Sequence, residues 1–282
     1  MDARSTMTGR GAARSGGQRG GGAARTGSTA GSSLRISPPR RDFVPLGHES
    51  AKFESMREPY YAALGEIFGM GYSTEDYIHN FPCFTGHQTL LRFLNLYELY
   101  RKAGDVAGHI GEIGVYKGAC SLFFAKLVHL FEPHSMTVVH GFDTFDGNRG
   151  QTGRDIGIKA GGYREPVERV RRLIEVQGLS HILHLHQMDV VRSLRKFLRE
   201  HPSLQFKLIV LDAGIYSVVR TALPLIWERV TPGGIVILDQ YNFEVAPGET
   251  VAVREVLPNA RVRTLSPAWM PTAYIVKPGD TP

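Results

Sequence analysis

The feature that most constrains this chain is a regular alternation of short apolar runs and amphipathic segments between residues 105 and 277. The runs "HIGEIGV" (109–115), "FKLIVLD" (206–212) and "IVILD" (235–239) indicate buried strands. Because parallel strands need helical crossovers, the alternation favours an α/β fold with a doubly wound, mostly parallel sheet of seven strands. The other expected strands are 136–143, 181–188, 261–265 and 273–277, and the expected helices are 87–103, 119–131, 163–177, 190–200, 217–229 and 248–257.

The last two expected strands are joined too tightly for a helical crossover. They should form a C-terminal antiparallel hairpin, so that one of them runs antiparallel to the rest of the sheet. Three of the expected helices carry apolar residues at helical spacing, which predicts the face that each turns to the core. These residues are Leu90, Leu91, Leu94 and Tyr97 in the first helix, Leu122, Ala125 and Leu130 in the second, and Val167, Val170 and Ile174 in the third.

Positive charge is concentrated at the amino-terminal end. Residues 1–41 hold eight Arg and one acid, a net charge of +7, whereas the other 241 residues hold 25 basic and 26 acidic side chains, a net charge of −1. This tail is mostly Gly, Ala, Ser, Thr and Arg, so it cannot bury enough apolar surface to offset the entropy of ordering and is expected to be disordered. Residues 42–104, which are rich in aromatic side chains, are expected to form a helical cap region before the α/β domain of residues 105–282.

Composition also narrows the setting of the protein. No apolar run approaches the roughly 20 residues that a membrane span needs, so no membrane association is expected. Cys83 and Cys120 make neither a disulfide framework nor a C-x-x-C motif, which favours a reducing, cytoplasmic location. The near-neutral body argues against nucleic-acid binding, because a basic patch should lie on the folded part.

The first strand of the alternation ends in "EIGVYKG", which places Glu112, Gly114 and Gly118 at a strand-to-helix turn. Ligands of doubly wound sheets bind at the carboxyl ends of the strands. The spacing E-x-G-x-x-x-G is neither the dinucleotide fingerprint nor a phosphate loop, and a carboxylate beside helix amides disfavours a diphosphate. S-adenosylmethionine (SAM) fits, because it carries a sulfonium and an ammonium but no phosphate. The alternative is a glycine-rich turn without a ligand.

Acidic residues also follow the second and third strands. Asp143, in "GFDTFDG", is expected to accept hydrogen bonds from the two ribose hydroxyls of SAM, and a turn or helix-capping role is the alternative. Asp189, in "HQMDVVRSL", lies where a group that contacts adenine would lie. It could equally cap the helix that begins at residue 190, and the sequence leaves both interpretations open.

The fourth and fifth strands end in Asp212 and in Asp239 followed by Gln240. These strands are neighbours in a doubly wound sheet, so two carboxylates and an amide oxygen should converge at one edge of the ligand cleft. Ligands that are all oxygen suit Mg²⁺, Ca²⁺ or Mn²⁺. The alternative is that Asp239 caps a loop and Asp212 binds no ligand.

These stretches resemble the macrocin O-methyltransferase family of class I SAM-dependent enzymes. The resemblance is carried by "GEIGVYKGACSLFFA", "GFDTFDG" and "LDAGIYSVVRTALPLIWERVTPGGIVILDQY", and it spans roughly residues 105–260. Its most specific parts are "FDTFDG" and "TPGGIVILDQY". It implies a Rossmann-like class I methyltransferase fold and Mg²⁺-dependent methylation of a hydroxyl on a sugar of an antibiotic or related natural product.

The resemblance also implies roles for single residues. Glu112, Gly114 and Gly118 match the motif around the methionine part of SAM, Asp143 matches the ribose acid, and Asp212 and Asp239 match two metal-binding aspartates. The chain departs from the family where Gln240 replaces a second Asp and Gly214 replaces a second acid. Catechol-type enzymes of the same fold have a lysine base at the position of Ile215.

The expected reaction is an in-line methyl transfer from SAM to a substrate oxygen, with Asp212 as the base and His140 or Tyr216 as substitutes. The expected acceptor is a glycoside or nucleotide sugar under the aromatic segment 52–86, and the enzyme is expected to be a homo-oligomer. The glycine-rich loop 147–163 is predicted to be a mobile lid. The rival hypotheses are a metal-independent small-molecule N- or O-methyltransferase and a non-catalytic partner subunit with the SAM-binding fold.

Overall fold

The computed structural model describes residues 51–265 and 270–279, all of which belong to a unit that spans Ser37–Pro282. The tail predicted to be disordered, residues 1–41, lies outside the described residues. None of the helices in the described ranges is long and apolar enough to cross a membrane.

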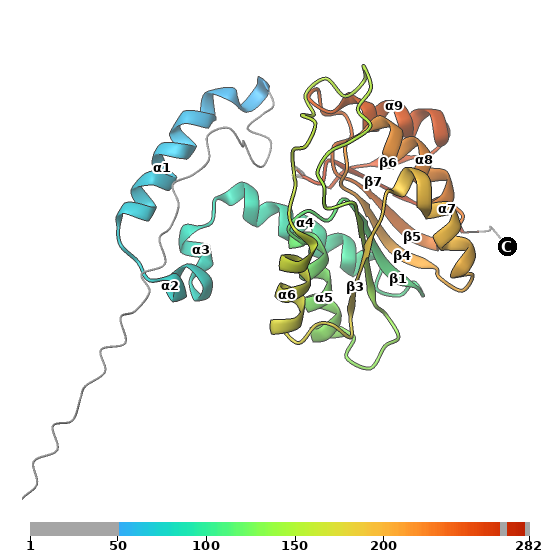
Figure 1. The fold of residues 1–282 in the computed structure, drawn as a ribbon, viewed down its shortest axis with the longest axis horizontal. Coiled ribbons are helices and arrows are strands. Elements are labelled where there is room, and N and C mark those ends of the chain that lie inside the picture. The colour runs from blue at the N-terminus through green and yellow to red at the C-terminus, as the bar shows by residue number, and fades with distance from the viewer. Residues whose placement is uncertain (1–50, 266–269, 280–282) are drawn as a thin grey trace, which may run out of the picture. The chain divides into compact units, whose positions relative to one another are not determined.

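A seven-stranded sheet with the strand order β3-β2-β1-β4-β5-β7-β6 organises the molecule (Figure 1). The first five strands in this order are parallel. β7 runs antiparallel to β5, and β6 pairs antiparallel to β7. This confirms the predicted doubly wound sheet with a C-terminal antiparallel hairpin. The strands are β1 (His109–Ile113), β2 (Val139–Asp143), β3 (Leu183–Gln187), β4 (Phe206–Leu211), β5 (Val230–Leu238), β6 (Val262–Arg263) and β7 (Ala273–Val276).

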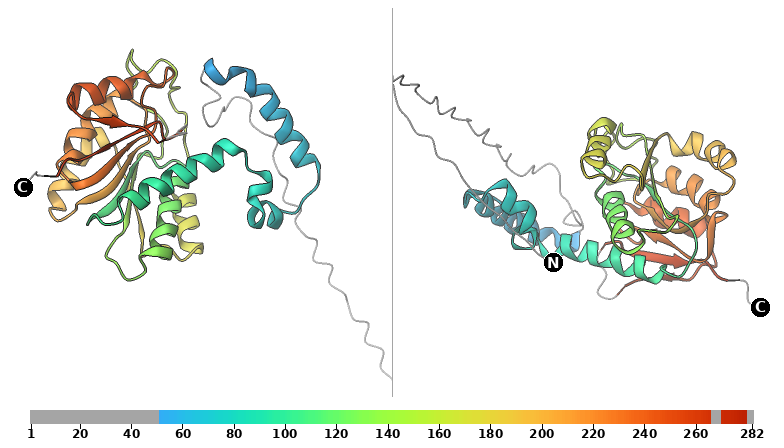
Figure 2. Two further views of the ribbon diagram at one scale, coloured as in Figure 1. Left: turned by 180° about the vertical axis from the view of Figure 1, so that it is seen from behind. Right: turned by 90° about the horizontal axis from the view of Figure 1, so that it is seen from below.

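Helices cover both faces of the sheet, because the central strands are apolar on both sides (Figure 2). In β4, Leu208 and Val210 join one buried cluster while Ile209 and Leu211 join the other. The first cluster is completed by α4, α5 and α6, and the second by α7, α8 and α9. These helices are α4 (His87–Lys102), α5 (Ala119–Phe131), α6 (Val167–Val176), α7 (Val190–Glu200), α8 (Tyr216–Trp227) and α9 (Pro247–Val256).

Short helices precede the sheet in the chain: η1 (Ala51–Met56), α1 (Arg57–Gly69), α2 (Thr74–His79) and α3 (Phe81–Phe84). A capping box begins α2, in which Ser73 accepts a hydrogen bond from the backbone of Asp76 and the Asp76 carboxylate accepts one from the backbone of Ser73. Aromatic contacts link the short helices, since Tyr77 lies 4.6 Å from Phe84 between ring centroids. Aromatic packing therefore supplies the core of a segment with few other apolar contacts.

Two of the four apolar residues that the sequence placed on one face of α4 are exposed, and so is one residue of α5, whereas Tyr97 of α4 packs against the core. Leu90 and Leu94 are 37% and 54% exposed, and Leu130 of α5 is 65% exposed. The buried residues of α4 are Gln88, Asn95, Leu96, Leu99 and Tyr100. The helix packs on the sheet through a polar first half and an apolar second half, so a rule that places only apolar residues inward misses the polar half and selects exposed residues. The predicted inward face of α6 is confirmed, since Val167, Val170 and Ile174 are all buried.

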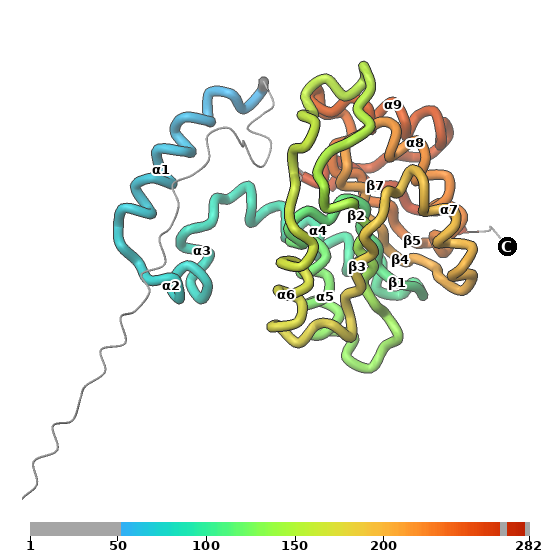
Figure 3. The backbone as a smooth tube through the Cα atoms, viewed as in Figure 1, coloured from blue at the N-terminus to red at the C-terminus, as the bar shows by residue number. Residues whose placement is uncertain are grey.

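The connection from β2 to α6, residues 144–166, runs past the carboxyl end of the sheet beside α8 and α9 (Figure 3). Asp155 anchors it: its Oδ1 accepts a hydrogen bond from the backbone N–H of Tyr216 (2.7 Å), at the start of α8. A Cβ on Gly157 would lie 2.0 Å from Val245, so the loop docks there only because residue 157 has no side chain. The structure shows these anchors, and the mobility of the predicted lid stays a prediction.

Candidate active site

The turn between β1 and α5 is shaped by two glycines that lie in the left-handed region. Gly114 has a φ of +95°, and a Cβ there would lie 2.2 Å from the carbonyl oxygen of Asp212. Gly118 has a φ of +83° at the N-cap of α5, and a Cβ there would meet Val170 at 3.0 Å. Between them Tyr116 also has a positive φ, of 51°. The predicted turn therefore exists at the carboxyl end of a parallel strand, which is where doubly wound sheets bind their ligands.

Glu112 lies near the end of β1 and is only 1% exposed. Its Oε2 accepts a short hydrogen bond from the Ser121 hydroxyl of α5. Burial raises the pKa of Glu112 to about 7, although Ser121 and Arg92 act in the opposite direction. A cation that reached this carboxylate would favour its charged form. The expected contact with the ammonium of SAM stays a prediction.

Asp143 ends β2 and holds the glycine turn in shape. Its Oδ2 accepts hydrogen bonds from the backbone N–H groups of Val115 (2.7 Å) and Tyr116 (2.8 Å), and its Oδ1 accepts one from Phe145 (2.7 Å). A carboxylate has about four lone-pair positions. The turn role that the sequence left open is therefore observed, and capacity for about one ribose hydroxyl remains.

Asp189 caps α7, because its Oδ1 accepts a hydrogen bond from the backbone N–H of Val191 (2.9 Å). The same residue borders a cavity of about 220 Å³ at the carboxyl ends of β2 and β3. Its capping role is therefore observed, while its predicted contact with adenine stays a prediction. The cavity is lined by Thr144, Asp146, Arg149, Gln187, Met188 and Asp189.

The three residues predicted to bind a metal lie together beyond β4 and β5. Gln240 Nε2 donates hydrogen bonds to Asp212 Oδ1 (3.1 Å) and to Asp239 Oδ2 (2.8 Å). Arg92 of α4 reaches between the same two carboxylates: Nη1 lies 2.5 Å from Asp239 Oδ1, and Nη2 lies 2.8 Å from Asp212 Oδ2. The guanidinium thus forms a fork with one arm on each carboxylate.

The two carboxylates differ in exposure. The side chain of Asp239 is 2% exposed, whereas that of Asp212 is 24% exposed and faces the cleft more openly. Burial raises the pKa of Asp212 well above its usual range, and the charge of Asp239 adds to the rise, while Arg92 opposes it. Burial lowers the pKa of the Arg92 guanidinium, but Asp239 and Asp212 more than offset this, so the net pKa is raised and the group stays charged.

A third acid, Glu249 of α9, is fully buried beside this group. Its Oε1 accepts a hydrogen bond from the backbone N–H of Gln240 (3.0 Å), and its Oε2 is buried without a hydrogen-bond partner. Burial raises the pKa of Glu249 well above its usual range, and Asp239 adds to the rise. Burial therefore disfavours the charged form of Glu249.

The arrangement does not fit a resident Mg²⁺. The guanidinium lies between the two carboxylates, and Gln240 turns its NH₂ group toward them while its Oε1 is buried without a partner. Over residues 51–265 and 270–279, no three His, Cys, Asp or Glu side chains are arranged to hold a metal ion. The geometry therefore gives no support to the predicted Mg²⁺, and no chemical step below is routed through a metal.

The substitutes named for the base have other partners. His140 of β2 is 9% exposed, and its Nδ1 lies 3.0 Å from Nε2 of His186 on β3. Burial lowers the pKa of His140 to about 3 and that of His186 to about 4. The Tyr216 hydroxyl donates a hydrogen bond to Glu255 (2.7 Å). Asp212 is therefore better placed than either to take a proton in the cleft.

Two residues of the site were missed by sequence reasoning. Arg92 lies in a leucine-rich helix, and Glu249 lies in the first turn of α9. The sequence carried one usable signal for Arg92: the polar positions Gln88, Arg92 and Asn95 recur at spacings of four and three, as one face of a helix does. Glu249 offered no signal, because an acid in a first helical turn is ordinary.

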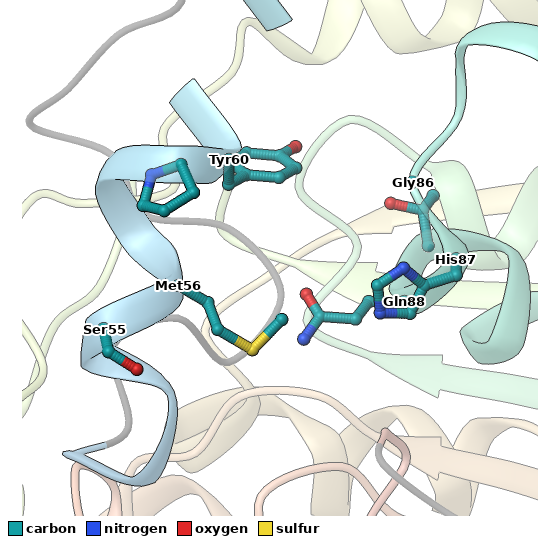
Figure 4. Close-up of a pocket in the computed structure, with 8 residues that line it drawn as sticks. Ser55, Met56, Tyr60, Gly86, His87 and Gln88 are labelled. Carbon is teal, nitrogen blue, oxygen red and sulfur yellow. The ribbon is translucent and has the colours of Figure 1, made fainter. Parts of the chain in front are cut away.

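A cavity of about 310 Å³ lies between α1 and the start of α4 (Figure 4). In Figure 4 the amide of Gln88 and the thioether of Met56 point toward each other across it. Gln88 is 8% exposed and lies one helical turn before Arg92. The lining residues are Ser55, Met56, Pro59, Tyr60, Gly86, His87, Gln88 and Thr89.

Comparison with known proteins agrees with the fold and the glycine turn. A family model described as a methyltransferase domain matches residues 112–241. A calicheamicin methyltransferase, CalS11, is 26% identical, with a TM-score of 0.70 over 86% of this chain and 97% of that chain. A second structure, described as apo CalS11, a TDP-rhamnose 3'-O-methyltransferase of calicheamicin biosynthesis, is 28% identical, with a TM-score of 0.63 over 84% and 97%.

The O-methyltransferase NovP shares the fold at 16% identity, with a TM-score of 0.53 over 67% of this chain and 81% of that chain. No curated protein sequence matches the chain. The sheet order and the matched domain define a class I methyltransferase fold. The protein is a SAM-dependent methyltransferase, and this confirms the predicted enzyme class and SAM as its cofactor.

Proposed function

We propose that this enzyme transfers the methyl group of SAM to a hydroxyl of a small molecule, namely a sugar of a natural product or its nucleotide-linked precursor. The observation that carries the proposal is the position of Asp212, which directly follows β4: its backbone carbonyl lies against the glycine turn, and its carboxylate is partly exposed. CalS11 supports the sugar acceptor, because its similarity covers most of both chains. A role in antibiotic biosynthesis and the narrower macrocin-type family remain parts of this proposal.

In the proposed reaction the acceptor oxygen attacks the methyl carbon in line with the sulfonium. The new C–O bond forms as the C–S bond breaks, and S-adenosylhomocysteine leaves as a neutral thioether. The hydroxyl proton passes to Asp212, whose raised pKa suits a base that must hold a proton after the transfer. Asp239 remains the buried partner of Arg92, so the two acids take different roles.

The cavity beside α4 is the proposed acceptor pocket. Its volume of about 310 Å³ lies at the lower end of the roughly 300–1,000 Å³ of small-molecule sites, which suits one sugar ring. Gln88 offers a buried amide to sugar hydroxyls, and Tyr60 offers an aromatic wall (Figure 4). Gln88 and Arg92, four residues apart in α4, share one face of the helix and connect this cavity with the two carboxylates.

The site supports the rival hypotheses to different degrees. The Arg92 fork favours a reaction without a metal, so the metal-independent methyltransferase is the stronger rival to the predicted Mg²⁺ enzyme. A hydroxyl acceptor needs a base, and the position of Asp212 favours it over an amine. The methyltransferase class argues against the non-catalytic partner subunit.

The homo-oligomer stays a prediction, and the exposed Leu90 and Leu94 of α4 are an apolar surface that a second copy could cover.

The test is a methyl-transfer assay with SAM and four acceptor types: a TDP-6-deoxyhexose, a glycoside, a catechol and an aliphatic amine. We expect S-adenosylhomocysteine and a product heavier by one methylene with a sugar acceptor. Asp212→Asn should lower kcat by about 10²–10⁴-fold, the usual contribution of a general base, while Asp105→Asn, at an exposed position, serves as the control. Transfer confined to the amine, or full activity of Asp212→Asn, would contradict the proposal.

A further inference from the structure

The position between Asp212 and Asp239 is already taken by a cation of the chain itself. Arg92 approaches Asp239 to 2.5 Å and Asp212 to 2.8 Å through its two terminal nitrogens. We propose that Arg92 is the resident cation of this carboxylate pair and that it excludes a divalent metal ion from the site. The enzyme would then hold its two acids in place without a metal.

The packing around Arg92 shows that this arrangement is built into the fold. The Arg92 side chain is 12% exposed, and α4 is fixed on the sheet by Asn95, Leu96 and Leu99 on the same side. Asn95 Nδ2 lies 3.5 Å from the carbonyl oxygen of Met270, next to β7. The guanidinium is therefore presented to the carboxylates by a helix that has no freedom to slide while its apolar half stays buried.

The charge count agrees with a single positive charge. The two carboxylates balanced by one guanidinium leave at most one net negative charge between them. A dication entering beside Arg92 would be repelled by the guanidinium at close range in a buried environment. The positions that could have added acids carry Gly214 and Gln240 instead.

The amide of Gln240 completes the same pattern. Its NH₂ group donates to both carboxylates, so each acid accepts hydrogen bonds from Gln240 and from Arg92. A metal shell would need Oε1 of Gln240 to face the carboxylates. In that orientation Asp212 and Asp239 would each lose the hydrogen bond that the Gln240 NH₂ group donates. Until a metal ion was bound, three oxygen-bearing groups would face one another.

The test is a titration of the purified full-length protein with Mn²⁺, followed by electron paramagnetic resonance, without SAM or acceptor. The wild type should show no site-specific Mn²⁺ binding at sub-millimolar concentrations. Arg92→Met removes the cation and keeps the apolar stem, so it should bind one Mn²⁺ at least tenfold more tightly than the wild type. Arg101→Met, at an exposed position in the last turn of the same helix, is the matched control and should behave as the wild type.

Three outcomes would overturn the inference. Stoichiometric, tight Mn²⁺ binding by the wild type would show that Arg92 does not exclude a metal. This measurement uses only the wild-type protein, so it does not depend on the folding of any variant. Equal or absent binding in folded Arg92→Met shows that Arg92 is not what keeps the metal out. Binding by Arg92→Met that survives Asp239→Asn shows that the metal lies elsewhere.

Folding of each variant is checked by its thermal transition. If Arg92→Met does not fold, Arg92→Gln takes its place, because an amide can still donate to one carboxylate without carrying a charge. The inference is independent of the acceptor, since Mn²⁺ binding is measured without a methyl transfer. Its failure is therefore distinguishable from failure of the sugar acceptor.

Discussion

At the scale of single residues, the acid that shapes the backbone, Asp143, is distinct from the acid that we propose as the base, Asp212. Asp143 accepts hydrogen bonds from three backbone N–H groups, two in the turn after β1 and one in the loop after β2. Asp212 is the more exposed of the two acids on the Arg92 fork. The types and positions of these acids were predictable from the strand ends, because parallel strands bring their carboxyl ends to one edge. Their hydrogen-bond partners were not, since the loops that supply them carry no sequence period.

The role of Asp143 can be tested by Asp143→Asn, which keeps the shape of the side chain. The new NH₂ group cannot accept, so at least one of the three backbone N–H groups loses its partner, at a cost of about 1–3 kcal/mol. We expect SAM affinity, measured by calorimetry, to fall at least tenfold and the melting temperature to fall with it. Asp105→Asn, at an exposed position outside both cavities, is the control. Unchanged SAM affinity in Asp143→Asn would refute this role.

Gln88, also at the scale of single residues, lines the proposed acceptor pocket. Gln88→Ala removes a buried amide from the cavity and leaves the Asp212 pair untouched. We expect KM for the sugar acceptor to rise about five- to thirtyfold, which corresponds to roughly 1–2 kcal/mol for one lost hydrogen bond, while KM for SAM stays the same. Steady-state kinetics in both substrates measure this difference. A rise in KM for SAM alone would place the acceptor elsewhere.

At the scale of elements, the sheet and its helices could be predicted from the alternation of apolar runs. The buried face of α4 could not be predicted from the composition of that helix. A rule based on apolar spacing selected Leu90 and Leu94, which are exposed. It cannot represent a helix that places Arg92 against two carboxylates and Asn95 against a backbone carbonyl. The partners of such a face lie in β4 and β5, more than a hundred residues away in the chain. Burial of polar groups is favourable only when such partners are present, and a local pattern carries no information about them.

The loop 147–163 shows the same limit at the scale of elements. Its glycines predicted mobility, which stays a prediction, but they gave no sign of the anchor at Asp155, which is 3% exposed and ties the loop to the start of α8. Asp155→Ala removes a side-chain acceptor for the Tyr216 N–H, which should cost about 0.5–2 kcal/mol, as loss of a helix cap does. We expect amide exchange in 147–163 to speed up while exchange in β4 stays unchanged. If Asp155→Ala leaves exchange in the loop as it was, the anchor is not Asp155.

At the scale of the whole molecule, stability should fall in acid because of the histidines between β2 and β3. Burial lowers the pKa of His140 to about 3 and that of His186 to about 4, well below the ordinary value of 6.5. The unfolded chain therefore binds protons below about pH 6.5 that the folded chain does not bind, so stability is full above that pH and is lost progressively toward pH 4. The free energy of unfolding, measured in urea between pH 7 and pH 4.5, should decline accordingly.

Substitution separates these histidines from the other titrating groups. His140→Gln should flatten the decline of unfolding free energy between pH 6.5 and pH 4.5, whatever its effect at pH 7, while the exposed His129→Gln should leave the slope of the wild type. The slope, rather than the absolute stability, is the informative quantity, because a buried substitution also changes packing. Equal slopes in all three proteins would show that the folded state takes up protons at this pair.

The close contact between Gly114 and the backbone carbonyl of Asp212 links the predicted SAM-binding turn to the proposed base. A Cβ on Gly114 would lie 2.2 Å from that oxygen, and the Asp212 N–H donates a hydrogen bond to the carbonyl oxygen of Ile113 (2.8 Å). The predicted SAM-binding turn and the proposed base are therefore joined through one stretch of backbone. We therefore expect binding at one of these positions to affect the other, and we expect ordered binding, with SAM first and the proposed acceptor second. Product inhibition reports it: S-adenosylhomocysteine should compete with SAM and show mixed inhibition against the acceptor.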